Sequence, residues 1–442
     1  MASSVNEREL VMEILLSVTR DGEYSHIALR NVLSNYQFLD KKARAFITRV
    51  TEGTLEHMIE IDYIINQFSK VKVNKMKPVI RTIIRSAVYQ LMYMDSVPNS
   101  AVCNEAVKLA VKKGFGTLKG FVNGVLRNIT RNLDNIQYPD PSEKVLWLSV
   151  KYSMPEWIVE QWLSVYDAET VEAMLQDFLK ERPTSVRCNL HKVSKEELMQ
   201  ALKNEQVKVE ENDKLPYALF ISEYDYLGAL ESFENGWFQV QDVSSMMVSE
   251  WADPKAGDYI IDVCAAPGGK SLHLADKLAF AEKEYTGIKG HVEARDLTEY
   301  KVNLIEENIM RTEAGNITAV CQDATVLDED SVNKADIVIA DLPCSGLGVL
   351  AKKTDLKYKM TPQTQKELVA LQRKMLSTVW QYVKPGGKLV YSTCTIHKGE
   401  NEENAAWFQA NYPQFKLLKE QQMIPGRDHT DGFYIALFER EL

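Results

Sequence analysis

Apolar residues recur at helical spacing through the first third of the chain. Leu10, Val11, Ile14, Leu15 and Val18 are spaced so that they fall on one face of a helix. The same spacing continues, with charged residues between the apolar ones, to about residue 132. Because the alternation typical of strands is nearly lacking in this stretch, the pattern predicts an all-helical domain over residues 1–135.

Local signals indicate where helices begin and where this domain ends. Asp40 precedes the run 41–44 and is predicted to cap a helix, because its carboxylate can accept a bond from a free backbone N–H. Pro98 marks a break before another helix. Residues 133–143 are rich in turn-forming residues and predict a linker.

A small mixed module is predicted after the linker. Residues 184–189 and 218–221 are typical of strands, and Ser194 with Glu197 forms a capping pair for a helix between them. We therefore expect a small α+β, RRM-like module at about 144–230.

From residue 237 onward, strand and helix patterns alternate. This order predicts an α/β domain over residues 231–442, with a mostly parallel sheet covered by helices on both faces. Three of its apolar runs are typical of buried strands and end in unusual residues: 259–264, 337–340 and 388–391. Ligands bind at the carboxyl ends of parallel strands, so these three ends are expected to face one crevice.

The first strand end leads into the loop Ala265-Ala-Pro-Gly-Gly-Lys270. Small residues let the backbone approach a ligand closely, and the helix predicted at 271–278 offers free N–H groups to an anion. The loop is neither GxGxxG nor a GxxxxGK[ST] phosphate loop, which disfavours a dinucleotide or ATP. S-adenosylmethionine (SAM) carries a single carboxylate and fits the shorter loop. Residues 279–289 are expected to form a loop insertion.

Two acids follow at the next strand ends. Asp296 stands where a carboxylate commonly accepts hydrogen bonds from ribose hydroxyls. Asp323 ends a third strand, where an adenine amino group could be held.

The six cysteines divide into two groups. A single cysteine in an apolar strand or helix is usually a small core residue, and four are interpreted in this way: Cys103, Cys188, Cys264 and Cys321. Cys344 and Cys394 differ, because each follows a strand end among Pro, Gly, Ser and Thr. Nearby cations favour the nucleophilic thiolate, and four lysines are candidates: Lys270, Lys352, Lys353 and Lys357. The pattern predicts a nucleotide-like cofactor beside a cysteine nucleophile.

Composition limits the class of protein. The 442 residues exceed one typical domain, no apolar run approaches the roughly 20 residues of a membrane span, and the first residues lack the pattern of a signal peptide. Scattered cysteines without CxxC pairs are typical of free thiols in a reducing cytoplasm. The seven histidines show no metal-ligand spacing, so no metal site is predicted.

Charge is distributed unevenly. Residues 1–135 hold 19 Lys and Arg against 13 Asp and Glu, whereas the remainder holds 33 against 49. A basic front section on an acidic body is compatible with RNA binding through a local patch, although solvated helix faces produce the same excess.

These residues resemble a known family, the RNA (cytosine-5) methyltransferases of the RsmB (Fmu/Sun) type. The matching segments in the second half are 183–189, 240–245, 262–270, 341–348, 391–394, 401–404 and 431–434. The front section is similar to the NusB-type helical domain of the same subfamily, through 89–95, 97–98, 104–107 and 121–127. The resemblance implies a Rossmann-like, SAM-dependent methyltransferase sheet preceded by a NusB-like domain and the small module.

The resemblance also implies roles for single residues. Cys394 matches the family's nucleophile, Cys344 the second cysteine that helps release the adduct, and Asp341 the acid that bonds to the pyrimidine edge. The residues expected to bind SAM are Cys264, Ala265, Ala266, Pro267, Gly268, Gly269, Lys270, Asp296, Asp323 and Asp341. The implied product is 5-methylcytosine in small-subunit (16S) rRNA. We expect a cytoplasmic enzyme, a monomer by default, that binds neither DNA nor membrane.

Two other classes compete with this interpretation. An amino-group methyltransferase also uses a strand-end motif, but it places an aromatic residue where Cys344 stands and has no task for Cys394. An RNA-binding module of a transcription complex would use the basic front section and would not need SAM. Dependence of activity on Cys394 tests the first alternative, and SAM binding tests the second.

Overall fold

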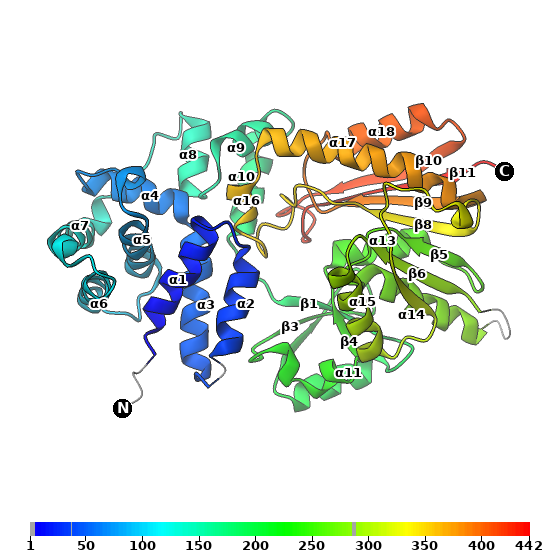
Figure 1. Ribbon diagram of the computed structural model, residues 1–442, viewed down its shortest axis with the longest axis horizontal. Helices are drawn as coiled ribbons and strands as arrows, with labels where there is room; N and C mark the ends of the chain where they lie inside the picture. The colour runs from blue at the N-terminus through cyan, green and yellow to red at the C-terminus, as the bar shows by residue number, and fades with distance from the viewer. Residues whose placement is uncertain (1–4, 37, 285–288) are drawn as a thin grey trace. The chain divides into compact units, whose positions relative to one another are not determined.

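The computed structural model describes residues 5–36, 38–284 and 289–442, which divide into two compact units (Figure 1). The first unit comprises Met1–Lys180 and Leu350–Lys359, and the second comprises Glu181–Val349 and Met360–Leu442. No helix in the described ranges is both long enough and apolar enough to cross a membrane.

The first unit is helical, as the sequence predicts. Its helices are α1 (Glu7–Thr19), α2 (Ser25–Asn35), α3 (Lys41–Glu56), α4 (Met58–Phe68), α5 (Pro78–Tyr93), α6 (Asn99–Lys112), α7 (Lys119–Arg131), α8 (Lys144–Lys151), α9 (Glu156–Leu163), α10 (Ala168–Phe178) and the short α16 (Leu356–Lys359). The cap at Asp40 is confirmed, since its carboxylate accepts a bond of 2.7 Å from the Ala43 N–H. Ile47, Ile61 and Ile84 are fully buried in the core that α1 to α7 share.

Residues 355–357, distant in sequence, form hydrogen bonds with the ends of two of these helices. Asp355 is buried and accepts bonds from Ser25 N (3.2 Å) and Ser25 Oγ (2.6 Å) at the first residue of α2. Lys357 is buried too, and its Nζ donates to the Glu56 carbonyl at the last residue of α3 (2.8 Å). A carboxylate thus lies at a helix N-terminus and an amine at a C-terminus, which matches the helix dipoles.

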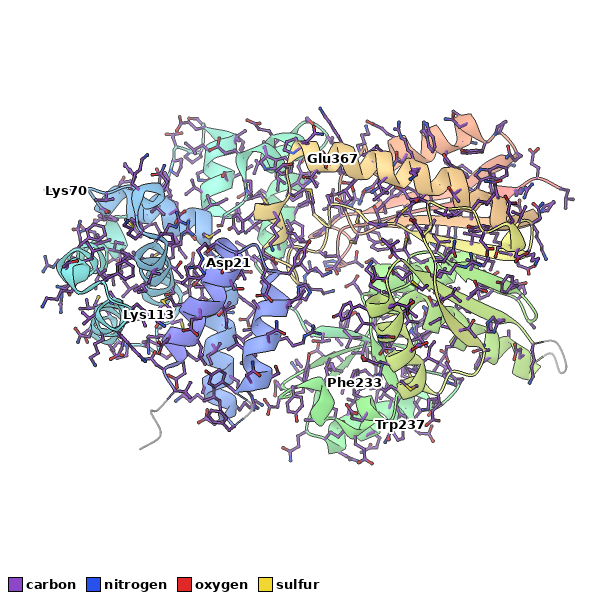
Figure 2. The ribbon with its side chains drawn as sticks, viewed as in Figure 1. Asp21, Lys70, Lys113, Phe233, Trp237 and Glu367 are labelled. Atoms are coloured by element: carbon purple, nitrogen blue, oxygen red, sulfur yellow. The ribbon has the colours of Figure 1, made fainter. Side chains whose placement is uncertain are left out.

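The second unit begins with a four-stranded antiparallel sheet. Its strands are β1 (Thr184–Cys188), β2 (Lys208–Glu211), β3 (Ala218–Ser222) and β4 (Phe238–Val240), in the order β2-β3-β1-β4. Between β1 and β2 lies α11 (Lys195–Asn204), and its predicted capping box of Ser194 and Glu197 is confirmed. Phe233 and Trp237 stand on the segment that leads into β4, in and after the short α12 (Glu231–Glu234) (Figure 2).

A larger sheet follows, in the order β10-β11-β9-β8-β5-β6-β7. Its strands are β5 (Tyr259–Asp262), β6 (His291–Asp296), β7 (Ile317–Cys321), β8 (Ala335–Asp341), β9 (Val383–Thr393), β10 (Phe415–Met423) and β11 (Phe433–Arg440). The five neighbouring strands β9, β8, β5, β6 and β7 are parallel, and β11 and β10 add an antiparallel edge. The prediction of a mostly parallel sheet is confirmed.

Helices cover both faces of this sheet (Figure 1). Ile260, Val292 and Ile339 pack on one face with α13 (Val243–Ala252), α14 (Gly269–Glu284) and α15 (Glu299–Thr312). The opposite face packs against α17 (Pro362–Val379) and α18 (Glu402–Asn411) through the alternate residues Ile261 and Val338. Alternate side chains of one strand therefore enter two separate cores, as expected for a sheet buried on both sides.

One local prediction is wrong. The insertion expected at 279–289 is helical as far as Glu284, because residues 279–284 continue α14. The sequence there, Ala-Phe-Ala-Glu-Lys-Glu, consists mainly of good helix formers and contains neither Gly nor Pro. Residues 285–288 lie outside the described ranges.

Candidate active site

The predicted site residues follow five neighbouring strand ends. From β9 to β7 they occur in this order: Cys394 after β9, Asp341 and Cys344 at and after β8, 264–270 after β5, Asp296 at the end of β6, and Asp323 after β7. The chain leaves β5 in one direction for β6 and β7 and returns to the other side of β5 for β8. Such a switch point leaves a crevice at the carboxyl ends of the strands, which is where ligands bind in this type of sheet.

Two thiols meet at the β8–β9 end of the row. The Sγ atoms of Cys344 and Cys394 are 3.3 Å apart, and neither cysteine forms a disulfide. The hydrogen bond to Cys394, together with burial, raises the pKa of Cys344 well above its usual value. A protonated Cys344 can donate to the Cys394 sulfur.

A close backbone contact fixes the Cys394 loop. Gly348 N donates to the Cys394 carbonyl (3.0 Å), and Gly432 N donates to the Gly348 carbonyl (2.8 Å). A Cβ atom added at Gly348 would lie 1.9 Å from the Gly432 carbonyl oxygen, so only glycine fits at this position.

Asp341 and Lys270 form an ion pair beside the thiols. Lys270 Nζ lies 2.7 Å from Asp341 Oδ2, and the Ser392 hydroxyl donates to Asp341 Oδ1 at 2.7 Å. Burial lowers the pKa of Lys270, but the charges of Asp341, Asp262 and Cys394 outweigh burial and raise it. Lys270 is therefore a cation beside the thiols, and a Cys394 thiolate would lie within its field.

A second carboxyl group, that of Asp262, stands at the end of β5. Burial raises the pKa of Asp262 to about 7, against the opposing effect of a bond from the Ser271 hydroxyl. That bond, to Oδ2, measures 2.6 Å, while Oδ1 is buried without a hydrogen-bond partner among the described residues. Asp262 can therefore exchange a proton near neutral pH.

Asp296 ties the Gly-rich loop to β6. Its Oδ2 accepts from Ala266 N (3.0 Å), and its Oδ1 accepts from Leu297 N (2.8 Å) and lies 2.9 Å from Lys301 Nζ. A carboxylate has about four acceptor positions, so one remains for a ligand hydroxyl. Sequence reasoning identified Asp296 but not Lys301, whose position depends on how α15 packs.

Asp323 lies one strand farther from the thiols. Gln322 N donates to the Asp296 carbonyl (2.9 Å), which holds the end of β7 beside the end of β6. Asp323 Oδ1 accepts from Thr325 N at 2.8 Å.

Two other predictions about this region need correction. Cys321 is exposed rather than buried, because it stands at the last position of β7, an edge strand. The lysines at 352, 353 and 357 belong to the first unit, and Lys357 is already bonded to the Glu56 carbonyl. Within the described ranges, no group of three His, Cys, Asp or Glu side chains could hold a metal ion.

Comparison with known proteins identifies the family. The "Probable ribosomal RNA small subunit methyltransferase B" of Bacillus subtilis (strain 168) is 33% identical over 456 residues, which cover 98% of each chain. The chain belongs to this family. The "Ribosomal RNA small subunit methyltransferase B" of Proteus mirabilis (strain HI4320) is 27% identical across the full length of both chains.

Family models divide this methyltransferase into three parts. Residues 5–131 match the NusB family, 154–224 match the RsmF/B-like ferredoxin-like domain, and 249–439 match the 16S rRNA methyltransferase RsmB/F. The resemblance stated from the sequence is therefore confirmed, as is the predicted fold class of helical domain, small mixed module and Rossmann-like sheet.

Solved structures share the fold of this family member. The crystal structure of PH0851 matches with a TM-score of 0.82 at 25% identity and covers 99% of both chains. NSun6 from Pyrococcus horikoshii, crystallised with SFG, matches with a TM-score of 0.58 at 24% identity, over 65% of this chain and 98% of that one.

SAM is the cofactor of this methyltransferase family, and the strand-end residues fit it. A Cβ atom added at Gly269 would meet nothing within 4 Å, so the backbone of the loop is open to a ligand. The first turn of α14 and Lys270 suit the SAM carboxylate. The free acceptor position of Asp296 suits a ribose hydroxyl.

Proposed function

We propose that this chain makes 5-methylcytosine in small-subunit rRNA through a covalent bond between Cys394 and the cytosine C6 atom. The observation that carries the proposal is the pair of thiols, 3.3 Å apart, beside the Asp341–Lys270 ion pair at the strand ends. An amino-group methyltransferase would have no use for two thiols in this arrangement. The proposed substrate follows the relatives, which are named as methyltransferases of small-subunit rRNA.

The chemistry explains why a thiol is needed. Cytosine C5 is a poor nucleophile. When the Cys394 thiolate adds to C6, the 5,6 double bond opens and its electron pair gives C5 the character of an enamine carbon. Bound SAM supplies the methyl group that C5 takes. Loss of the C5 proton to a base then restores the double bond and expels the Cys394 thiolate.

Three neighbours of Cys394 would support these steps. Lys270 stabilises the thiolate by its charge, and Asp341 bonds to the N3/N4 edge of the base, sharing a proton as electrons build up there. Cys344 lies 3.3 Å from the sulfur that must leave, so it can assist release of the adduct. The target base must be turned out of any stack to reach the sulfur.

The cofactor would extend along the row of strand ends away from the thiols. Its methionine part would lie on the loop 264–270, its ribose on Asp296 and its adenine amino group near Asp323. The order of the strands, β8-β5-β6-β7, supports this direction, because the methyl end of SAM would then lie beside Asp341 and Cys344.

We also propose three domains with separate tasks. Residues 1–135 would form a NusB-like RNA-binding domain, 144–230 a small module, and 231–442 the catalytic domain. The family matches at 5–131, 154–224 and 249–439 support this division. Helices α8 to α10 nevertheless belong to the first compact unit, which extends to Lys180.

A map of methylated cytosines tests the proposal. Small-subunit rRNA from cells with and without the gene should differ at a specific cytosine by base-resolution methylcytosine sequencing. A copy of the gene encoding the wild-type chain should restore the signal, and one encoding Cys394→Ser should not. Identical maps, or a missing methyl group on an amino nitrogen instead, would contradict the proposal.

A further inference from the structure

A single buried carboxylate, Glu400, joins the two loops that carry the thiols. Its side chain is fully buried. Glu400 Oε2 accepts from the backbone N–H of Ser345 at 2.8 Å, and Oε1 accepts from the Ser345 hydroxyl at 2.5 Å. Ser345 directly follows Cys344, and its hydroxyl also lies 2.7 Å from Thr395 Oγ1, on the residue after Cys394. Glu400 is therefore bonded directly to the residue after Cys344 and, through the Ser345 hydroxyl, linked to the residue after Cys394.

Two more donors complete the surroundings of Glu400. Gln372 Nε2 donates to Oε2 at 3.0 Å and to the carbonyl of Pro343, the residue before Cys344, at 2.9 Å. His397 Nδ1 lies 3.1 Å from Oε1 and is the one basic group within ion-pair distance in the described ranges. A buried carboxylate with four donors is fully bonded, and its removal leaves those donors unpaired.

We propose that Glu400 is a positioning residue that sets the distance between the Cys344 and Cys394 sulfur atoms. It acts through Ser345 and Gln372, which hold the Cys344 loop against the Cys394 loop. At 3.3 Å the Cys344 thiol can donate to the Cys394 sulfur, so the same contact that stabilises a Cys394 thiolate keeps Cys344 within reach of the adduct. The catalytic consequence rests on the proposed function, whereas the effect on thiol reactivity does not.

The variant Glu400→Gln tests this role while keeping the shape of the side chain. Its amide NH2 would face donors, either Ser345 or Gln372, and the two loops would separate. The expected loss in kcat is about 10- to 100-fold, because small misplacements of reacting groups have effects of that size. The Kd for SAM and the KM for RNA should stay within about threefold, since Glu400 touches neither proposed binding region.

Alkylation of the thiols provides a readout that does not depend on methyl transfer. Iodoacetamide labelling of Cys394, measured across pH by peptide mass spectrometry, should shift to higher pH in Glu400→Gln. Labelling of the exposed Cys321 in the same molecules should not change. Cys344→Ala should produce the same shift, and the double variant with Glu400→Gln should add nothing to it, because both changes remove one interaction.

One control variant and one substitute variant accompany this test. Glu403→Gln, an exposed neighbour in α18, should match the wild type in kcat and in labelling. If Glu400→Gln does not fold, Ser345→Ala removes one donor and should give a smaller shift in the same direction. An unchanged Cys394 profile in whichever of the two variants folds, or an additive shift in the double variant, would overturn the positioning role. A shifted profile in an enzyme that forms no adduct with RNA would instead overturn the proposed function and leave this inference standing.

Discussion

Each unit of the molecule buries a glutamate beside a histidine, and the two are used differently. In the helical unit, Glu60 of α4 accepts hydrogen bonds from the hydroxyls of Tyr93 and Tyr138, and His57 Nδ1 lies 3.1 Å away. In the sheet unit, Glu400 has a comparable set of donors. Neither has a lysine or arginine within ion-pair distance among the described residues.

The difference lies in what the donors are attached to. Burial, with the nearby charge of Glu60, raises the pKa of both Tyr93 and Tyr138, so both phenols stay protonated and hold parts of the helical unit together. Two of the donors to Glu400 belong to Ser345, the residue after Cys344, and Ser345 in turn contacts Thr395, the residue after Cys394. A buried and fully bonded carboxylate therefore identifies an ordered polar site, and only the chemistry of its neighbours indicates a function.

The largest expected effect comes from the thiols themselves. Cys394→Ser should reduce methyl transfer by roughly a thousandfold or more, since loss of a nucleophile removes the covalent route altogether. Cys344→Ser keeps the nucleophile but slows release, so an enzyme–RNA complex should accumulate that survives denaturing electrophoresis. If the trapped complex forms with Cys394→Ser instead, the two roles are exchanged. Modest destabilisation without a trapped complex in either variant would make both cysteines packing residues.

The next largest effect is expected from the part of the proposed site that would bind SAM. Asp296→Ala should weaken SAM binding by about 10- to 100-fold, the range expected for loss of a bond to a charged acceptor. Isothermal calorimetry measures this directly, and RNA affinity should be close to that of the wild type. Asp330→Ala, an exposed acid after β7, is the matched control. Equal SAM affinity in both variants would remove Asp296 from the site.

The glutamate of the helical unit should affect stability and not chemistry. Glu60→Gln should lower the free energy of unfolding by about 1–3 kcal/mol, because it places an amide against buried donors. Methyl transfer per folded molecule, measured by single turnover below the unfolding transition, should remain near the wild-type value. A fall in that rate as large as the one in Glu400→Gln would erase the distinction between the two carboxylates.

The stability of the helical unit should depend on pH because Lys357 is buried. Burial lowers its pKa to about 7, so the folded chain releases this proton well before the unfolded chain does. Between that pH and the usual lysine value near 10.4, the unfolded state binds more protons, and stability should rise with pH by up to about 1.4 kcal/mol per unit. Lys357→Met should remove this rise in denaturant titrations at several pH values. The exposed Lys353→Met should keep it.

The smallest expected effect concerns RNA binding by the helical unit. Lys70, labelled in Figure 2, and Lys75 have no carboxylate within ion-pair distance in the described chain. Lys108, by contrast, pairs with Glu105 at 2.8 Å, and Lys113 pairs with Glu9. The double change Lys70→Ala/Lys75→Ala should weaken RNA binding several-fold and reduce the salt dependence by about one for each phosphate that is no longer bound. Lys108→Ala should change neither. Equal slopes in all three proteins would mean that another surface meets the RNA.

The sequence by itself determined the helical front section, the alternation of strands and helices in the second half and most of the proposed site. Helical spacing, caps at Asp40 and Ser194, and strand ends rich in Gly, Asp and Cys are local signals, because they depend on neighbours within a few residues. The loop 264–270 and the two cysteines of the proposed site could be selected in this way. Residue types that are rare inside strands and helices mark the ends where ligands bind.

Only the tertiary structure decided which distant residues meet. The 3.3 Å between Cys344 and Cys394, the pair of Lys270 with Asp341, and the place of Glu400 between two loops all depend on the pairing of β8 with β9 and the packing of α17 and α18. The same holds for Lys357, which the sequence suggested as a cation near the thiols and which the fold places at the end of α3. Burial and through-space contact are properties of the packed chain, and no pattern along the sequence encodes them directly.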